Sequence, residues 1–152
     1  MKRLPVTDNE VVLFTKMVRS INLFASMNMG LLESILRHIN YFEFDPQEVV
    51  CRQGDAGDSF YVVAEGRLSV KVKSGFFSSA KQVAELKPGD CFGEMALLLR
   101  AKRNATVTCE EPSKLFVLLA DHFDAAAKQN PAFAEEIKHL AADRKFELDH
   151  KK

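Results

Sequence analysis

Between residues 41 and 120 the chain is a series of short β-rich runs, each ended within a few residues by a turn signal. The runs are YFEF, EVVC, SFYVVAEG, RLSVKV, KQVAEL, NATVTC and SKLFVLL. Turn-forming pairs such as Asp45-Pro46, Gly57-Asp58 and Pro88-Gly89 separate them. Strands this short and this regularly interrupted are typical of a compact antiparallel roll or barrel. The sequence therefore predicts a mainly β core, an antiparallel β-roll that is jelly-roll-like in its layout.

Helical periodicity brackets these runs on both sides. Apolar residues at helical spacing predict one helix over 7–20, with Thr7 or Asp8 as its N-cap, and a second over 30–39. After residue 120 the pattern predicts a helix near 121–128. A longer helix is expected to start at Pro131, because proline suits the first helical position.

At 152 residues the chain is long enough for one core and too short for two ordinary domains. We therefore expect one α+β domain in three parts. These parts are an N-terminal helical arm (1–40), the β-roll (41–120) and the C-terminal helices (121–152).

Charge and cysteine usage exclude several classes of protein. The 21 basic and 21 acidic side chains cancel, so no global field favours nucleic acid. No run approaches the roughly eighteen apolar residues of a spanning helix, so we expect no membrane insertion. Cys51, Cys91 and Cys109 are odd in number and set among apolar residues, which favours reduced thiols and a cytoplasmic location.

One segment, residues 92–107, departs from the pattern of short strands separated by turns. A glycine is followed by helix-forming residues and then by a basic cluster just before a strand. A helix that begins near Gly93 would point free backbone N–H groups outward and favour an anion. Arg103 has the planar fork that binds two phosphate oxygens, and Glu94 accepts hydrogen bonds from a hydroxyl. On spacing alone, however, a surface ion pair between Glu94 and Arg103 is the commoner arrangement.

The letters of this segment, FGEMALLLRAKRNATV, resemble the phosphate-binding cassette of the cyclic-nucleotide-binding family. Upstream, GDAGDSFYVVAEGRLSV resembles the β-roll signature of the same family. The resemblance implies a regulatory domain that binds cAMP or cGMP, with no catalytic activity, cofactor or metal. It also implies that the C-terminal helices act as a hinge and a lid over the base.

The resemblance assigns the ribose 2′-hydroxyl to Glu94 and the cyclic phosphate to Arg103, with backbone groups around them completing the pocket. The residues implied to contact the ligand are Phe92, Gly93, Glu94, Met95, Ala96, Arg103, Asn104 and Ala105. None is implied to be catalytic or to bind a metal. Apolar residues of the lid, such as Leu140 and Phe146, are candidates for contact with the base.

The sequence departs from the family pattern at two places. Where the family commonly has a Gly-x-Pro turn, this chain has Arg100-Ala101-Lys102, which predicts a more helical and more positive loop. Asn104 follows the arginine, at a position where a hydroxyl tends to favour guanine. Its amide is both donor and acceptor, so cAMP is favoured only slightly over cGMP.

Other functions find little support in the sequence. It contains no Walker-type loop, dinucleotide fingerprint or nucleophile elbow, so we expect no enzyme activity. The four histidines lack a complete metal-binding arrangement and are expected to be solvated. The expected partners are the nucleotide and an effector domain or protein. Two alternatives remain: a degenerate domain that serves only as a protein-interaction module, and a pocket altered for another nucleotide.

Overall fold

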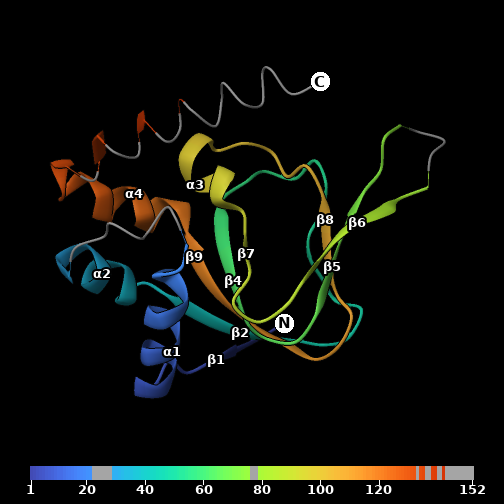
Figure 1. Cartoon of the computed structure of the whole chain (residues 1–152), viewed down its shortest axis with the longest axis horizontal. Helices are drawn as coiled ribbons and strands as arrows, with labels where there is room; N and C mark the ends of the chain where they lie inside the picture. The colour runs from blue at the N-terminus through green and yellow to red at the C-terminus, as the bar shows by residue number, and fades with distance from the viewer. Residues whose placement is uncertain (22–28, 76–78, 133, 136–137, 140–141, 143–152) are drawn as a thin grey trace.

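The computed structural model describes residues 1–21, 29–75, 79–132, 134–135, 138–139 and 142. Within them, the strands form two sheets with antiparallel pairing throughout (Figure 1). The five-stranded sheet has the order β1 (Lys2–Leu4), β2 (Asn40–Phe44), β9 (Ser113–Leu119), β4 (Ser59–Glu65) and β7 (Cys91–Phe92). The four-stranded sheet has the order β3 (Val49–Cys51), β8 (Thr106–Cys109), β5 (Leu68–Val72) and β6 (Lys81–Leu86).

The helices gather at one side of the roll. They are α1 (Asp8–Val18), α2 (Met29–Leu36), α3 (Glu94–Leu99) and α4 (Ala120–Lys128). Figure 1 shows α1, α2 and α4 together beside the five-stranded sheet, with α3 at the end of β4 and β7. This arrangement places α3 between the roll and α4.

Two hydrophobic cores share the strand β4. Phe60 and Val62 of this strand pack into the larger core beneath the helices, where Phe14 meets Phe116 edge-on with ring centroids 5.2 Å apart. Val63 faces the smaller core inside the roll, and Tyr61 packs against that core. The alternation follows from the strand geometry, in which successive side chains point to opposite faces. Both faces of β4 are therefore covered.

The predicted β-roll with helices at both ends is confirmed, and each β-rich run forms a strand. Two strands were not predicted. β1 is three residues long and ends just before Pro5, and β7 is two residues long within the turn-rich GDCFG. Neither is long enough to form a β-rich run of the kind on which the strand predictions depended.

The two N-terminal helices form where they were predicted. Thr7 occupies the N-cap position of α1, and its hydroxyl bonds the Glu10 carboxylate rather than a backbone N–H. The prediction of a more helical loop after α3 is wrong. α3 ends at Leu99, and Arg100 adopts the left-handed conformation with φ of 52°.

The C-terminal helix is described only in part. Pro131 and Ala132 are helical, as are the described residues at 134–135, 138–139 and 142. The face expected to contact the base, including Leu140 and Phe146, lies outside the described residues. The lid therefore remains a prediction.

The three cysteines are free thiols, as predicted. None of the helices in the described ranges is long and apolar enough to cross a membrane. The expectation of solvated histidines is wrong for His122. Its ring stacks on that of His38 at 4.4 Å, and its Nδ1 is buried without a hydrogen-bond partner among the described residues.

Candidate ligand-binding site

A cavity of about 240 Å³ opens between α3 and the inner face of the roll. This is slightly below the roughly 300–1,000 Å³ range of small-molecule pockets. The predicted site residues that line it are Phe92, Gly93, Glu94, Ala96, Arg103, Asn104 and Ala105. The eighth, Met95, belongs to α3, and its side chain lies outside the described residues. The structure thus brings a carboxylate and a guanidinium, nine positions apart in sequence, to one cavity.

Five further residues line the cavity and were not among the predicted site residues: Cys51, Val70, Ala101, Lys102 and Val107. Val70 and Val107 are direct partners across β5 and β8. They form an apolar wall opposite α3. Both residues belong to predicted strands, but their pairing could not be predicted because it depends on the strand register.

A larger hollow of about 560 Å³ lies on the other face of the same strand pair. It is lined by Lys71 and Thr106, each the sequence neighbour of a cavity residue and therefore on the opposite face of the sheet. Among the described residues of its lining, Lys73 is the other charged residue, and none of them carries a carboxylate. Of these two, the smaller cavity is the better candidate because its described lining includes both a carboxylate and a guanidinium.

Gly93 occupies the N-cap position of α3. Its φ of 89° lies in the left-handed region that only glycine adopts readily. A Cβ at this position would lie 2.6 Å from Nη1 of Arg103 and 2.6 Å from the carbonyl oxygen of Ser59. Both the conformation and the close approach therefore require glycine here.

Arg103 is held from several directions. Its Nη2 donates a 2.6 Å hydrogen bond to the carbonyl oxygen of Ser59 in β4. The backbone of Arg103 exchanges two bonds with the turn after β3: its N–H donates to Asp55 at 2.8 Å, and its carbonyl accepts from Gly54 at 2.7 Å. The guanidinium therefore reaches the cavity from a fixed backbone.

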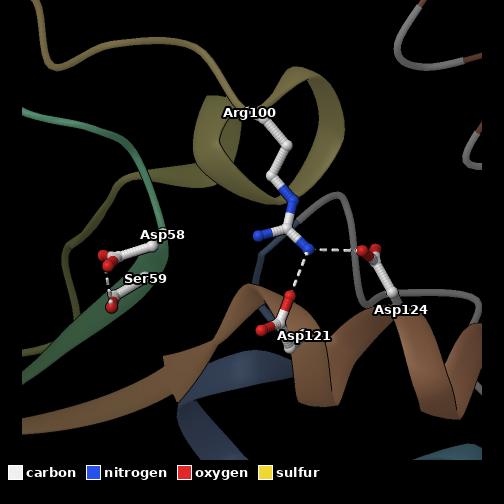
Figure 2. A network of polar contacts seen from close by, with 5 residues as sticks. All are labelled: Asp58, Ser59, Arg100, Asp121 and Asp124. Carbon is white, nitrogen blue, oxygen red and sulfur yellow. Dashed lines mark hydrogen bonds and ion pairs between the residues drawn. The ribbon is translucent and has the colours of Figure 1, made fainter.

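The loop between α3 and Arg103 is fixed by packing and by charge. Gly57 approaches it so closely that a Cβ there would lie 2.0 Å from the Ala101 carbonyl oxygen. Figure 2 shows Arg100 reaching from the end of α3 to α4, where Nη2 donates to Asp121 at 2.9 Å and to Asp124 at 2.5 Å. These pairs link the loop to α4.

The chemistry of the cavity suits binding. A guanidinium recognises an anionic group and a carboxylate recognises a hydroxyl. α3 is only six residues long, so its contribution is local N–H groups rather than a large dipole. Burial raises the pKa of the Cys51 thiol, so this cavity residue stays protonated and is a poor nucleophile.

Comparison with known proteins gives a consistent result. The family model described as "Cyclic nucleotide-binding domain" matches residues 41–130. Human potassium/sodium hyperpolarization-activated cyclic nucleotide-gated channel 3 is 28% identical over 144 residues, which cover 93% of this chain and 18% of the channel. The cAMP-dependent protein kinase regulatory subunit of Dictyostelium discoideum is 44% identical over 89 residues, 49% of this chain and 27% of the subunit.

A solved structure described as "cAMP bound PfPKA-R (141-441)" superposes with a TM-score of 0.74 at 25% identity, covering 82% of this chain and 44% of that one. The chain spans less than a third of the length of the channel and the kinase subunit that it matches. The family match includes the roll, the cavity and α4. The chain belongs to the cyclic nucleotide-binding domain family.

Proposed function

We propose that this chain is a sensor that binds a cyclic nucleotide, cAMP more readily than cGMP, in the cavity beside α3. The observation that carries the proposal is that Glu94 and Arg103 line the same cavity. Arg103 would bind the cyclic phosphate and Glu94 would accept a hydrogen bond from the ribose 2′-hydroxyl. Backbone groups near Gly93, Met95 and Ala105 would complete the phosphate pocket.

The apolar wall of Val70 and Val107 supports the placement of the remaining parts of the ligand. With the phosphate at Arg103, the ribose and base would lie along this wall. Asn104 lines the cavity and is exposed, so its amide is available to whichever base is bound. Asn104→Thr should raise the affinity for cGMP relative to cAMP in a competition assay, because a hydroxyl replaces the amide.

Occupancy would be transmitted through the C-terminal helices to an effector domain or protein. The contact between Arg100 and α4 supports this route, since it joins the loop that carries Arg103 to the helix that leads to the C-terminal residues. The proposal assigns no catalytic step to the chain and no nucleic acid partner. The free thiols fit a cytoplasmic location, where disulfides are rare.

The test is calorimetric titration with cAMP and cGMP. Arg103→Ala should weaken binding by about tenfold to a hundredfold, because a charge-assisted hydrogen bond contributes roughly 1.5–3 kcal/mol. Lys102→Ala is the matched control, since Lys102 is a neighbouring cation of the same cavity but is exposed to solvent. It should change affinity far less.

A modified ligand tests the role of Glu94. The 2′-deoxy analogue of cAMP should bind the wild-type protein more weakly than cAMP, and Glu94→Ala should abolish that difference. If neither nucleotide gives heat or raises the melting temperature, the binding proposal is wrong. The chain would then fit the alternative of a degenerate domain used only for protein contacts.

A further inference from the structure

Tyr61 lies behind Arg103 rather than in the cavity. It sits in β4, two residues after Ser59, and is absent from the residues that line the cavity. Its ring stacks on that of Phe92, its cross-strand partner in β7, with centroids 4.7 Å apart and planes 13° apart. Phe92 itself lines the cavity. Tyr61 therefore contributes to the site only through its neighbours.

The guanidinium of Arg103 lies over the ring of Tyr61. Its Cζ is 5.6 Å from the ring centroid, within the roughly 6 Å at which a cation is attracted to an aromatic face. Burial raises the pKa of the Tyr61 hydroxyl, and this effect outweighs the opposing effect of the Arg103 charge. The phenol is therefore neutral at physiological pH, so the attraction is to the ring face rather than to a phenolate.

Three groups surround the guanidinium on the protein side. They are the ring of Tyr61, the Ser59 carbonyl oxygen that accepts from Nη2, and Gly93, which leaves room for Nη1. A free arginine side chain loses rotamer entropy when it is fixed. If it is fixed before the ligand arrives, that cost falls on folding rather than on binding.

We propose that Tyr61 is a positioning residue for nucleotide binding: stacked on Phe92, its ring face holds the Arg103 guanidinium toward the cavity. This inference rests on the proposed function, because it concerns the residue assigned to the phosphate. It goes beyond that function because it attributes part of the affinity to an aromatic ring outside the cavity. A ring that served only to fill the core would contribute through its shape and not through its electrons.

Fluorination separates these two contributions. Pentafluorophenylalanine at position 61 keeps nearly the size of phenylalanine but removes the negative charge from the ring face, which is the source of the attraction. With Tyr61→Phe as the reference, the fluorinated variant should bind cAMP about threefold to thirtyfold more weakly in calorimetric titration. Equal affinities for the two variants would overturn the proposal.

Tyr41 supplies a matched control. It is the other tyrosine of the chain and stacks on Phe116 at 4.7 Å, but within the described residues no cation lies over its ring. The same pair of substitutions at position 41 should leave the affinity for cAMP unchanged. If fluorination at position 41 weakens binding as much as at position 61, the effect is general and the proposal fails. Thermal unfolding of each variant checks that it is folded.

A double-mutant cycle tests whether Tyr61 acts through Arg103. In an Arg103→Ala background, the phenylalanine and pentafluorophenylalanine variants at position 61 should bind cAMP equally, because the cation is gone. A difference that persists without Arg103 would contradict the inference. Failure of the proposed function looks different: the wild-type chain itself would bind neither cAMP nor cGMP, which would refute both proposals.

Discussion

Replacement of Gly93 by alanine tests the geometry of the site most directly. The added Cβ has two consequences that can be separated. A non-glycine residue in the left-handed region costs roughly 1–2 kcal/mol. In addition, the Cβ would approach Nη1 of Arg103 and the Ser59 carbonyl oxygen to 2.6 Å, closer than side-chain carbons approach such atoms. Overpacking of this kind typically costs a further 1–3 kcal/mol or so.

Gly89→Ala is the matched control. Gly89 has a φ of +94°, close to the +89° of Gly93, but a Cβ at position 89 would meet nothing within 4 Å. Gly89→Ala should therefore lower the unfolding free energy by the conformational cost alone, about 1–2 kcal/mol. For a chain of this size that corresponds to about 2–4 °C in melting temperature per kcal/mol.

Gly93→Ala should lower the melting temperature by about twice as much as Gly89→Ala, and it alone should weaken cAMP binding, by about tenfold or more, because the guanidinium is displaced. The assays are thermal unfolding and calorimetric titration of both variants. If the two variants lose the same stability and both bind cAMP like the wild type, the Arg103 guanidinium does not lie against Gly93.

Three further predictions concern other parts of the structure. Arg100→Ala should lower the unfolding free energy by no more than about 1 kcal/mol in chemical denaturation, because the pairs with Asp121 and Asp124 are solvent-exposed. Arg100→Gly should be more stable than Arg100→Ala, because it removes the same pairs but suits the left-handed conformation of this residue. Burial, with smaller effects of Glu94 and Asp90, raises the pKa of Cys91 from 9.0 to about 11. Between about pH 9 and 11 the folded state therefore keeps a proton that the unfolded state loses, and the unfolding free energy should fall as the pH rises. Cys91→Ala should reduce that fall in urea titrations. Truncation after Gln129 should weaken cAMP binding severalfold in calorimetry. Thermal unfolding should stay cooperative, because the roll and α4 retain their cores. An unchanged affinity would show that the predicted lid does not contribute to binding.

The strands were predictable because runs of β-branched and aromatic residues are bounded by turn signals. Phe60 and Val62 face the helices while Val63 faces the roll, so the letters SFYVVAEG contain the continuous apolar run of a strand that is covered on both faces. The charged residues of the cavity were predictable for a different reason, since glycine, carboxylate and arginine all lie within the single segment 92–107. Local order carries both signals: the predicted strands form, and Gly93, Glu94 and Arg103 line one cavity.

The features that sequence reasoning missed depend on distant contacts. The loop after α3 was expected to be more helical, but Arg100 ends the helix where its side chain meets α4, more than twenty positions further along the chain. Tyr61 gave no signal of a role in the site, because its neighbours Phe92 and Arg103 are set by strand pairing. His122 was read as solvated because nothing local indicated its contact with His38.

The elements around Arg103 differ in how firmly they are held. β4 supplies the Ser59 carbonyl and Tyr61, and it is covered by a core on each face, so it can move only if both cores are disturbed. α3 is tied to the larger core through Leu97, and the loop to Arg103 is held by close packing at Gly57 and by backbone bonds to Gly54 and Asp55. The ion pairs from Arg100 to α4 are solvent-exposed and individually weak, so they cost less to break than any of these contacts. A ligand can change the conformation only through its differential affinity for the two arrangements. We therefore expect a ligand-driven change to break the Arg100 pairs with α4 before it disturbs either core.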